Sequence, residues 1–242
     1  MKKVFIDAGH GGTDPGAVGN GLKEKDIALA VSLAIKKRLE SEYEGVQVIL
    51  SRSTDVFPSL TARTNAANKA GSDILVSIHC NAAGGAGGFE TFRYTSASAA
   101  SSALQNVLHT EIMAQLKPYG VNDRGLKSKD LHMCRESKMP AVLTENLFID
   151  VVSDAAKLKR DDVIEAIVSG HVSGIAKYLG LKKKEVVPVP NSDKVTVIVN
   201  GKQIADGKLV DGVTLVPLRA VGEALGAKVG WDNKTKTATI TK

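Results

Sequence analysis

The sequence predicts an α/β fold, in which helices flank a mainly parallel twisted sheet, followed by a small C-terminal α+β module of ββ-α-ββ type. Three short apolar runs end abruptly in polar residues, which is typical of strands buried on both faces. These runs cover residues 4–10, 73–81 and 141–146. Helical patterns separate the runs along the chain, and this alternation favours a parallel sheet joined by right-handed crossovers.

The three runs each lead into an ionisable side chain, namely His10, His79 and Glu145. Parallel strands place their carboxyl ends along one edge of the sheet, where open α/β folds bind their ligands. We therefore expect the three side chains to lie close together, although they are far apart in the sequence. This expectation depends only on strand direction.

Hydrophobic periodicity and turn signals predict the other elements that precede residue 180. A glycine-rich loop over residues 10–20 leads to a helix that begins at Glu24 and carries apolar residues at i, i+3 and i+4. Asp26 is a second acidic residue in the first turn, which suits the helix dipole. The remaining predicted elements are strands over 46–50, 89–94 and 131–134 and helices over 60–70, 101–116 and 161–179.

A charged segment with two prolines covers residues 182–193, and such a segment is typical of a semi-extended connector at a domain boundary. We therefore expect one large domain over residues 1–181, a linker over 182–193 and a small module over 194–242. Asn200-Gly201 is a strong hairpin signal in this module. Its predicted elements are strands over 195–199, 202–205, 213–216, 228–231 and 237–241 and a helix over 218–225.

Composition and charge limit the class of protein. Of the 242 residues, 43% are hydrophobic and 24% are charged, as in ordinary globular proteins. The net charge of +6 includes eight Lys/Arg against five Asp/Glu in residues 191–242, and this basic tail favours an anionic polymer as partner. Aromatic residues make up only 4%, which argues against base stacking and a nucleic-acid partner. Two cysteines, Cys80 and Cys134, provide neither a disulfide framework nor a zinc knuckle.

The N-terminal sequence lacks a secretory signal. Lys2 and Lys3 are followed by a short apolar stretch that Asp7 interrupts, whereas a signal peptide needs about 7–15 apolar residues. No stretch approaches the roughly 20 apolar residues of a membrane span. We therefore expect the chain to be made in the cytoplasm without a signal peptide. The sequence does not predict the oligomeric state.

A hydrolytic zinc site needs two imidazoles and a carboxylate around the ion, with one position open for water. A second carboxylate is then needed to accept and return protons. His10, His79 and Glu24 can supply the first group, and Glu145 can supply the second. Their spacing alone does not single them out, because ligands this dispersed form no local signature.

The motifs DAGHGGTDPGAVG, GLKEKD, LVSIHCNA, GGFETFRY and PAVLTEN resemble those of the zinc-dependent N-acetylmuramoyl-L-alanine amidases of the amidase-3 family. The resemblance covers about residues 3–180 and keeps the order of the family's motifs. It implies Zn²⁺ bound by His10, Glu24 and His79, with Glu145 as the catalytic carboxylate. It also implies peptidoglycan as substrate, with hydrolysis of the amide that joins the lactyl group of N-acetylmuramic acid to L-alanine.

Two departures from the commoner family pattern adjoin these residues. Cys80 follows His79, and because neighbouring side chains in a strand point to opposite faces, we expect no change in mechanism. Asn146-Leu147 follows Glu145 and is expected to alter only the packing near the site.

Two further residues are candidate substrate contacts. We expect Arg124 to bind a stem-peptide carboxylate, which suits the bidentate geometry of a guanidinium, although a solvated turn residue is an equal alternative. His132 lies in the polar segment before Glu145 and is the second candidate.

Other polar residues are expected to be structural. His171 lies on the apolar stripe of its helix and is expected to pack in the core, whereas His109 is expected at the surface. Arg63 and Asp55 are expected to form an ion pair between a helix and a loop.

The motifs VNGK and TLVPLRAVGEALGAKVGWDNKTKTATI, over about residues 194–242, resemble the small N-terminal module of copper amine oxidases. This segment has no His or Cys, so the resemblance implies no copper site. Its basic charge and its position after a catalytic domain favour a role in cell-wall binding. A spacer or a dimerisation unit is the alternative.

The first functional hypothesis is therefore a zinc hydrolase that lyses peptidoglycan, either as an endolysin of a phage or prophage or as an autolysin of a spore former. Such an enzyme would reach the cell wall through a holin or by cell lysis. A zinc peptidase or deacetylase acting on peptidoglycan is the alternative chemistry, and a non-catalytic wall-binding protein is a third hypothesis. New L-alanine amino termini in the products would identify the amidase.

Overall fold

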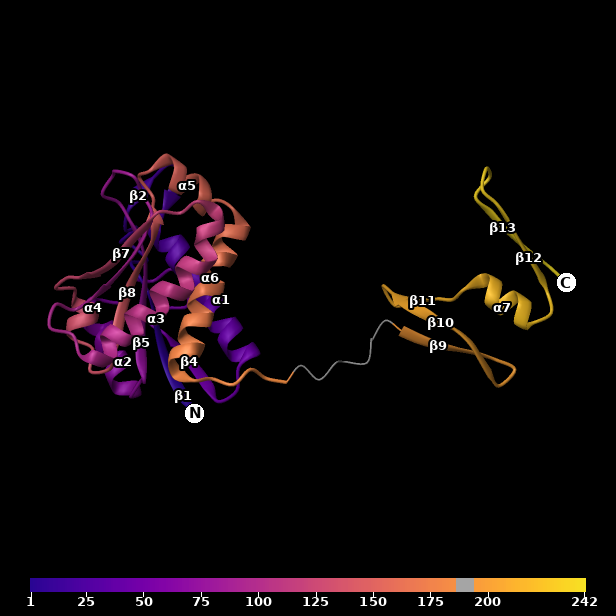
Figure 1. Ribbon diagram of the computed structural model, residues 1–242, viewed down its shortest axis with the longest axis horizontal. Helices are drawn as coiled ribbons and strands as arrows, with labels where there is room; N and C mark the ends of the chain where they lie inside the picture. The colour runs from indigo at the N-terminus through magenta and orange to yellow at the C-terminus, as the bar shows by residue number, and fades with distance from the viewer. Residues whose placement is uncertain (186–193) are drawn as a thin grey trace. The chain divides into compact units, whose positions relative to one another are not determined.

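The computed structural model describes residues 1–185 and 194–242. The chain divides into two compact units, Met1–Lys184 and Glu185–Lys242 (Figure 1). The predicted linker falls mostly on residues 186–193, which lie outside the described residues.

A six-stranded sheet forms the centre of the larger unit. Its strands are β1 (Lys2–Ala8), β4 (Val46–Leu50), β5 (Ile74–Asn81), β6 (Phe89–Arg93), β7 (Asp123–Ser128) and β8 (Ala141–Phe148). Their spatial order is β4-β1-β5-β8-β6-β7. The strands β4, β1, β5 and β8 are parallel, β6 runs antiparallel to β8, and β7 is parallel to β6. The prediction of a mainly parallel sheet is thus confirmed.

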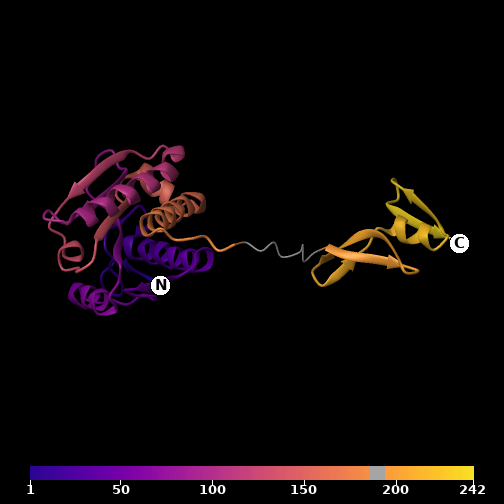
Figure 2. The ribbon, with the colours of Figure 1, turned by 60° about the horizontal axis from the view of Figure 1, so that its bottom comes forward.

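Helices cover both faces of this sheet. They are α1 (Glu24–Glu42), α2 (Leu60–Ala70), α3 (Ala99–Leu116), α4 (His132–Arg135), α5 (Val152–Leu158) and α6 (Asp161–Leu179). The long helices α1, α3 and α6 pack side by side over the main hydrophobic core (Figures 1 and 2). The opposite face carries α2 and the short α4 over a smaller core, so this face is covered less completely. Among the described residues, no helix combines the length and the apolar character that crossing a membrane requires.

Local signals fix the bounds of α2, which match the prediction. The hydroxyl of Ser59 caps the helix by accepting a hydrogen bond from the Ala62 amide at 3.2 Å. Gly71 ends the helix with a φ of 60°, a left-handed conformation that glycine adopts without strain. The predicted start of α1 and both ends of α6 are also confirmed.

Three segments differ from the predictions. Residues 131–134, predicted as a strand, lead into the helix α4. The neighbours Met133 and Cys134 are both buried there, whereas successive side chains of an edge strand would point to opposite faces. The strand β7 was not predicted, since its sequence DRGLKS is mostly polar and its structure comes from pairing with β6 at the sheet edge. The helix α5 is only seven residues long, which is too short for an apolar period to stand out.

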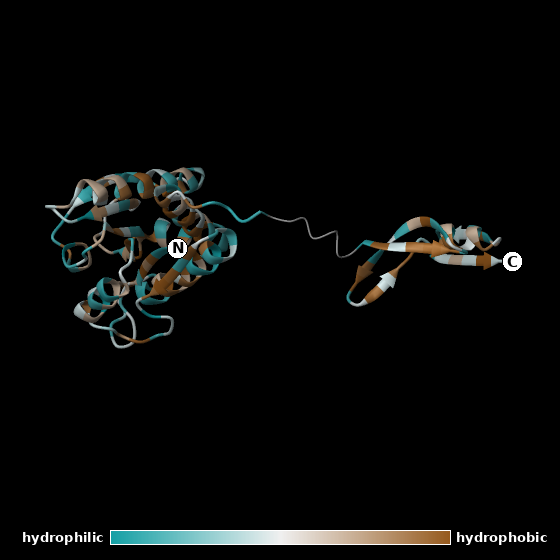
Figure 3. Cartoon of the chain, turned by 90° about the horizontal axis from the view of Figure 1, so that it is seen from below, coloured by the Kyte–Doolittle hydropathy of each residue, from teal (hydrophilic) through white to brown (hydrophobic). Residues whose placement is uncertain are grey.

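The smaller unit contains an antiparallel sheet, a short helix and a hairpin. Its elements are β9 (Lys194–Val199), β10 (Lys202–Val210), β11 (Val213–Leu215), α7 (Leu218–Ala224), β12 (Lys228–Asp232) and β13 (Thr237–Thr241). Asn200 and Gly201 connect β9 to β10 with φ values of 52° and 76°, as the hairpin signal predicted. Figure 3 shows hydrophobic residues along the strands of both units.

His171 lies in the core of the larger unit, as its position on the apolar stripe predicted. Its Nδ1 donates a hydrogen bond to the Ile167 carbonyl at 2.8 Å, and its Nε2 lies 3.0 Å from the Thr144 hydroxyl. Burial lowers the pKa of His171 from 6.5 to about 4. The neutral imidazole therefore has a partner at each nitrogen, and protonating it in the folded state is unfavourable.

We predict that His171 makes the larger unit sensitive to acid. The pKa of His171 is lower in the folded than in the unfolded state. Its contribution to the free energy of unfolding is therefore fully present above pH 6.5 and is lost as the pH falls towards about 4. The loss is on the order of 3 kcal/mol. Urea unfolding of the wild type and of His171→Gln at pH 7 and pH 4.5 measures it. A difference between the two proteins that stays constant with pH would contradict the prediction.

Candidate active site and metal centre

Strand register places three ionisable side chains in one row across the sheet. His79 on β5 is paired with Glu145 on β8, and Glu145 is paired with Glu90 on β6. Residues directly opposite each other in neighbouring strands have side chains on the same face. The row therefore lies on the face that carries α2 and α4, and Cys80 points to the opposite face, into the main core. The structure thus brings His79 and Glu145 together, as strand direction predicted.

Two buried arginines hold the backbone that presents His10, which follows β1 with a φ of 58°. Arg63 donates to the carbonyls of Ala8 and His10, and Arg52 donates to the carbonyls of Ala8 and Gly9. These bonds, together with the hydrogen bond from the Gly9 amide to the Ile78 carbonyl at 3.1 Å, fix an irregular piece of chain beyond the end of β1. His10 is consequently held in a defined place beside the end of β5.

The predicted ion pair between Arg63 and Asp55 is wrong. Arg63 instead pairs with Asp7 at 2.8 Å, and both side chains are buried. Asp55 pairs with Lys25 at 2.7 Å and accepts from the Gly12 amide. The physical reason is that a buried guanidinium needs a buried counter-charge, which Asp7 supplies from within β1.

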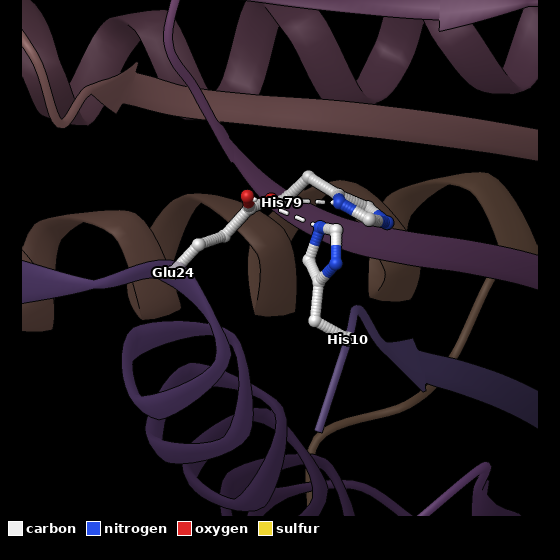
Figure 4. A group of neighbouring side chains, drawn as sticks. All are labelled: His10, Glu24 and His79. Carbon is white, nitrogen blue, oxygen red and sulfur yellow. Dashed lines mark hydrogen bonds and ion pairs between the residues drawn. The ribbon is translucent and has the colours of Figure 1, made fainter. Parts of the chain in front are cut away.

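His10, Glu24 and His79 converge on one point (Figure 4). The Glu24 carboxylate lies between the two imidazoles, 3.1 Å from His10 Nε2 and 2.8 Å from His79 Nδ1. It also accepts hydrogen bonds from the backbone amides of Ala17 and Cys80 at 2.8 and 3.0 Å. One ligand atom from each of the three residues lies within 4.8 Å of the others.

The charges of this cluster suit a cation. Burial alone would raise the pKa of Glu24, but hydrogen bonds with His10 and His79 outweigh burial and hold the pKa well below its usual range. Glu24 is therefore an ionised carboxylate with only 4% of its surface exposed. Asp14 accepts from His10 Nδ1 at 2.8 Å, which orients the ring and leaves Nε2 facing Glu24.

The residues fit a divalent metal ion such as Zn²⁺. Two imidazole nitrogens and one carboxylate oxygen are a donor set that zinc prefers. Glycines in the surrounding backbone leave room for the ligand side chains. A Cβ on Gly9 would lie 2.4 Å from the His79 ring. A Cβ on Gly16 would lie 2.6 Å from both Glu24 Oε2 and His10 Cδ2. The space for the three ligands is thus built by the loop after β1.

Glu145 has the properties of a proton carrier. Its Oε2 is buried and has no hydrogen-bond partner in the part of the chain that the structure describes. Burial raises the pKa of Glu145 to about 7, an effect that the charge of His79 opposes. Buried carboxylate oxygens without a partner are rare and mark places where a ligand or a reacting group is expected.

A β-bulge follows Glu145. The pairing of β5 with β8 passes from His79–Glu145 to Asn81–Phe148, so β8 contains one extra residue. Leu147 in the bulge has a φ of 67°, and Asn146 Nδ2 donates to the His79 carbonyl at 3.0 Å. Bulges beside active sites re-aim a side chain and are stable features of a fold. Asn146 and Leu147, the two residues that depart from the family pattern, therefore form the bulge next to Glu145.

Sequence reasoning missed a charged cluster centred on Glu90. This carboxylate, 3% exposed, accepts from Asn81 Nδ2 at 2.7 Å, from Arg124 Nε at 2.8 Å and from Lys127 Nζ. The Arg124 guanidinium also lies over the Phe148 ring, 4.6 Å from its centroid. The signal that could have revealed Glu90 is its place beside Phe89 within the predicted strand over 89–94, because a charge there needs a partner.

The remaining histidines lie away from the cluster. His132, a predicted substrate contact, is in α4 with Nε2 3.3 Å from the Thr64 hydroxyl. His109 is buried and bonds Asp123 at 2.8 Å, so the prediction of a surface position is wrong. The reason is that α3 packs on the sheet edge formed by β6 and β7, which covers the polar side of the helix as well.

Comparison with known proteins relates both units to described families. Residues 4–177 match the family described as N-acetylmuramoyl-L-alanine amidase, and residues 198–242 match the copper amine oxidase N-terminal domain. The chain is 48% identical over 183 residues to a sporulation-specific N-acetylmuramoyl-L-alanine amidase of Bacillus subtilis (strain 168), covering 76% of this chain and 70% of that one. It is 50% identical over 194 residues to an endolysin of Bacillus phage SPP1, covering 79% and 71%.

Solved structures give the same relationship. The catalytic domain of CwlV, an N-acetylmuramoyl-L-alanine amidase from Bacillus (Paenibacillus) polymyxa var. colistinus, superposes with a TM-score of 0.70 at 35% identity, covering 75% of this chain and all of that one. An N-acetylmuramoyl-L-alanine amidase from Clostridium difficile 630 superposes with a TM-score of 0.70 at 34% identity, covering 74% and 97%.

We predict that Gly16→Ala weakens zinc binding by roughly tenfold to a hundredfold, because its methyl group displaces Glu24 or His10. Gly21→Ala is the matched control, since Gly21 has a similar φ of 77° but only the Lys159 ammonium within 4 Å, at 3.9 Å. Competition against a chromophoric zinc chelator measures both affinities. Equal affinities of the two variants would show that the loop does not shape a metal site.

Proposed function

Since this chain belongs to the N-acetylmuramoyl-L-alanine amidase family, we propose that it is a zinc amidase whose metal is held by His10, Glu24 and His79. It is an enzyme that hydrolyses the amide between N-acetylmuramic acid and L-alanine in peptidoglycan and thereby lyses cell wall. One observation carries the metal assignment: three ligand atoms, from the loop after β1, from α1 and from β5, lie within 4.8 Å of one another. We assign Glu145, paired with His79 in the sheet, as the catalytic carboxylate.

Zinc bound there would supply Lewis acidity to the scissile carbonyl and to the attacking water. The chain's own residues supply the proton transfers. Glu145 Oε2 accepts a proton from the water as the new C–O bond forms, and returns it to the alanine nitrogen as the C–N bond breaks. A pKa of about 7 makes Glu145 able to act in both directions near neutral pH. Asp14 keeps the His10 ring oriented throughout.

We propose that Arg124 and His132 contact the substrate. Arg124 donates from Nε to Glu90 and from Nη1 to the Gly87 carbonyl at 3.4 Å, and 30% of its side chain is exposed beside the catalytic row. A stem-peptide carboxylate is a suitable partner for such a guanidinium. His132 packs beside the first turns of α2 on the same face of the sheet, which supports a contact further from the reacting atoms.

We propose a catalytic domain over residues 1–181, a linker over 182–193 and a wall-binding module over 194–242. The module's excess of basic residues and its separate elements support this division. The enzyme acts on the cell wall, and the similarity to an endolysin and to a sporulation amidase supports release through a holin or by cell lysis. Co-sedimentation of the full chain and of a chain without the module with purified walls tests the binding role.

We predict that Glu145→Gln lowers kcat by about a hundredfold or more, because general acid–base catalysis is lost, while zinc content and wall binding stay unchanged. The control Glu44→Gln changes an exposed glutamate and should keep full activity. Chelator should abolish wild-type activity, and added zinc should restore it.

Mass spectrometry of digested sacculi identifies the bond that is cut. New L-alanine amino termini are the expected products. Free acetate, or cleavage between two residues of the stem peptide, would instead indicate a deacetylase or a peptidase. Full activity in metal-free protein would rule out the zinc assignment.

A further inference from the structure

The two flanks of the metal cluster differ in chemistry. On the side of β1 and α2, the cluster borders a cavity of about 220 Å³ whose walls include His10 and His79. Phe57 and Leu60 form the apolar part of this wall. On the side of β8, β6 and β7, the row continues from Glu145 to Glu90 and its two cations. A substrate lying across the strand ends therefore meets an apolar surface at one end and a charged one at the other.

The apolar flank is held in place although it is exposed. Phe57 and Leu60 are 49% and 52% exposed, so a ligand in the cavity can cover them. The Phe57 ring lies near the buried Arg63 guanidinium, whose Cζ is 6.0 Å from the ring centroid. The preceding loop is fixed by Asp55, which accepts from the Gly12 amide at 2.7 Å. An aromatic ring held this way can pack against the face of a sugar ring or against methyl groups.

The group around Glu90 on the charged flank carries more positive than negative charge. Arg124 and Lys127 both contact Glu90, so two cations surround one carboxylate. The neighbouring cations hold the pKa of Glu90 below its usual value against the effect of burial. Their side chains are 30% and 36% exposed. One positive charge is therefore left to attract an anion at the edge of the site.

The proposed chemistry fixes which end of the substrate lies on which flank. Glu145 must reach the alanine nitrogen to protonate it, so the stem peptide begins on the Glu145 side of the cluster. The acyl group, with its lactyl methyl and sugar ring, then lies on the opposite side. Neighbouring strands are about 4.8 Å apart, so β7 is roughly 10 Å from β8. An extended dipeptide spans about 7 Å, and a lysine or arginine side chain covers the remainder.

We propose that the muramoyl group packs on Phe57 and Leu60 while the stem peptide runs over Glu145 towards Lys127. Lys127, together with Arg124, binds the free carboxylate of the second stem residue. This makes Phe57 a specificity residue for the sugar and Lys127 a specificity residue for the peptide. The proposal rests on the amidase function, because the direction follows from the leaving nitrogen.

The test compares kcat/KM for three substrates. The first is N-acetylmuramoyl-L-alanyl-D-glutamine, whose one peptide carboxylate is the α-carboxylate of the second residue. The second is the α-amide of the same compound, which has no peptide carboxylate. The third is this α-amide with a lactyl group in place of the muramoyl group, so it lacks the sugar. The wild type should prefer the free carboxylate by roughly tenfold, the effect of one charge-assisted hydrogen bond. Lys127→Met should reduce that preference severalfold and leave the sugar preference unchanged. Lys129→Met, at an exposed position of the next loop, is its control.

Phe57→Ala should have the opposite pattern. It should lower the preference for the muramoyl over the sugar-free substrate by about tenfold and leave the carboxylate preference intact. Val56→Ala is the control, because Val56 is 50% exposed in the same loop but does not line the cavity. The unchanged ratio in each variant also shows that the variant is folded.

Three results would overturn the proposal. In the first, the wild type has the same kcat/KM with and without the carboxylate. In the second, Phe57→Ala lowers the carboxylate preference and Lys127→Met lowers the sugar preference, and in the third, neither variant changes either preference. Failure of the amidase function itself has a different signature. It would appear as wild-type digests of all three substrates without free L-alanine amino termini.

Discussion

The buried carboxylate of Glu24 is the interaction on which the catalytic unit depends. It begins α1, yet it contacts His10 after β1 and His79 in β5, so it joins three elements that are distant in sequence. Four hydrogen-bond donors, two of them backbone amides, surround a charge that water would otherwise solvate. Removing one partner of such a buried charge costs about 3–5 kcal/mol, so the arrangement is held tightly once the fold has formed.

Neighbouring features keep this arrangement open to a ligand. Arg63, neutralised by Asp7, fixes the backbone before His10 without using the imidazole. The glycines beside the cluster leave space where any side chain would enter it. The bulge after Glu145 breaks the ladder between β5 and β8 at the point where a reactive carboxylate is needed. The sheet edge thus combines a rigid frame with a buried Glu145 oxygen that has no partner among the described residues, which suits the proton transfers proposed for this carboxylate.

Much of the larger unit could be predicted from the sequence because its elements are long and apolar. Buried parallel strands read as continuous hydrophobic runs, and their direction alone placed His79 beside Glu145. Glu24 could be named as a candidate ligand from its place at a helix start, but only the family resemblance singled it out, since an acidic residue at a helix start has an ordinary explanation. The edge strand β7 and the short helix α5 were not predicted, because pairing and packing with neighbouring elements define them more than their own sequence pattern does.

Beyond the segment that forms α4, the errors concern the partners of polar side chains. The predictions of the Arg63 partner and of a surface position for His109 were wrong. Both side chains bond to residues of other elements, and the local sequence pattern does not indicate which elements lie next to each other. Glu90 was missed for the same reason: its three donors come from β5 and β7. The role of a charged group in a sheet can therefore be interpreted only once the strand order is known. Here that order places Glu90 in the same row as Glu145, beside the proposed path of the substrate.

Anomalous diffraction at the zinc edge, from crystals of the full chain grown with zinc, tests the central claim most directly. The account predicts one strong peak about 2.0–2.2 Å from an imidazole nitrogen of His10, an imidazole nitrogen of His79 and a carboxylate oxygen of Glu24. A strong peak bound elsewhere on the chain, or none at these three residues at saturating zinc, would contradict it.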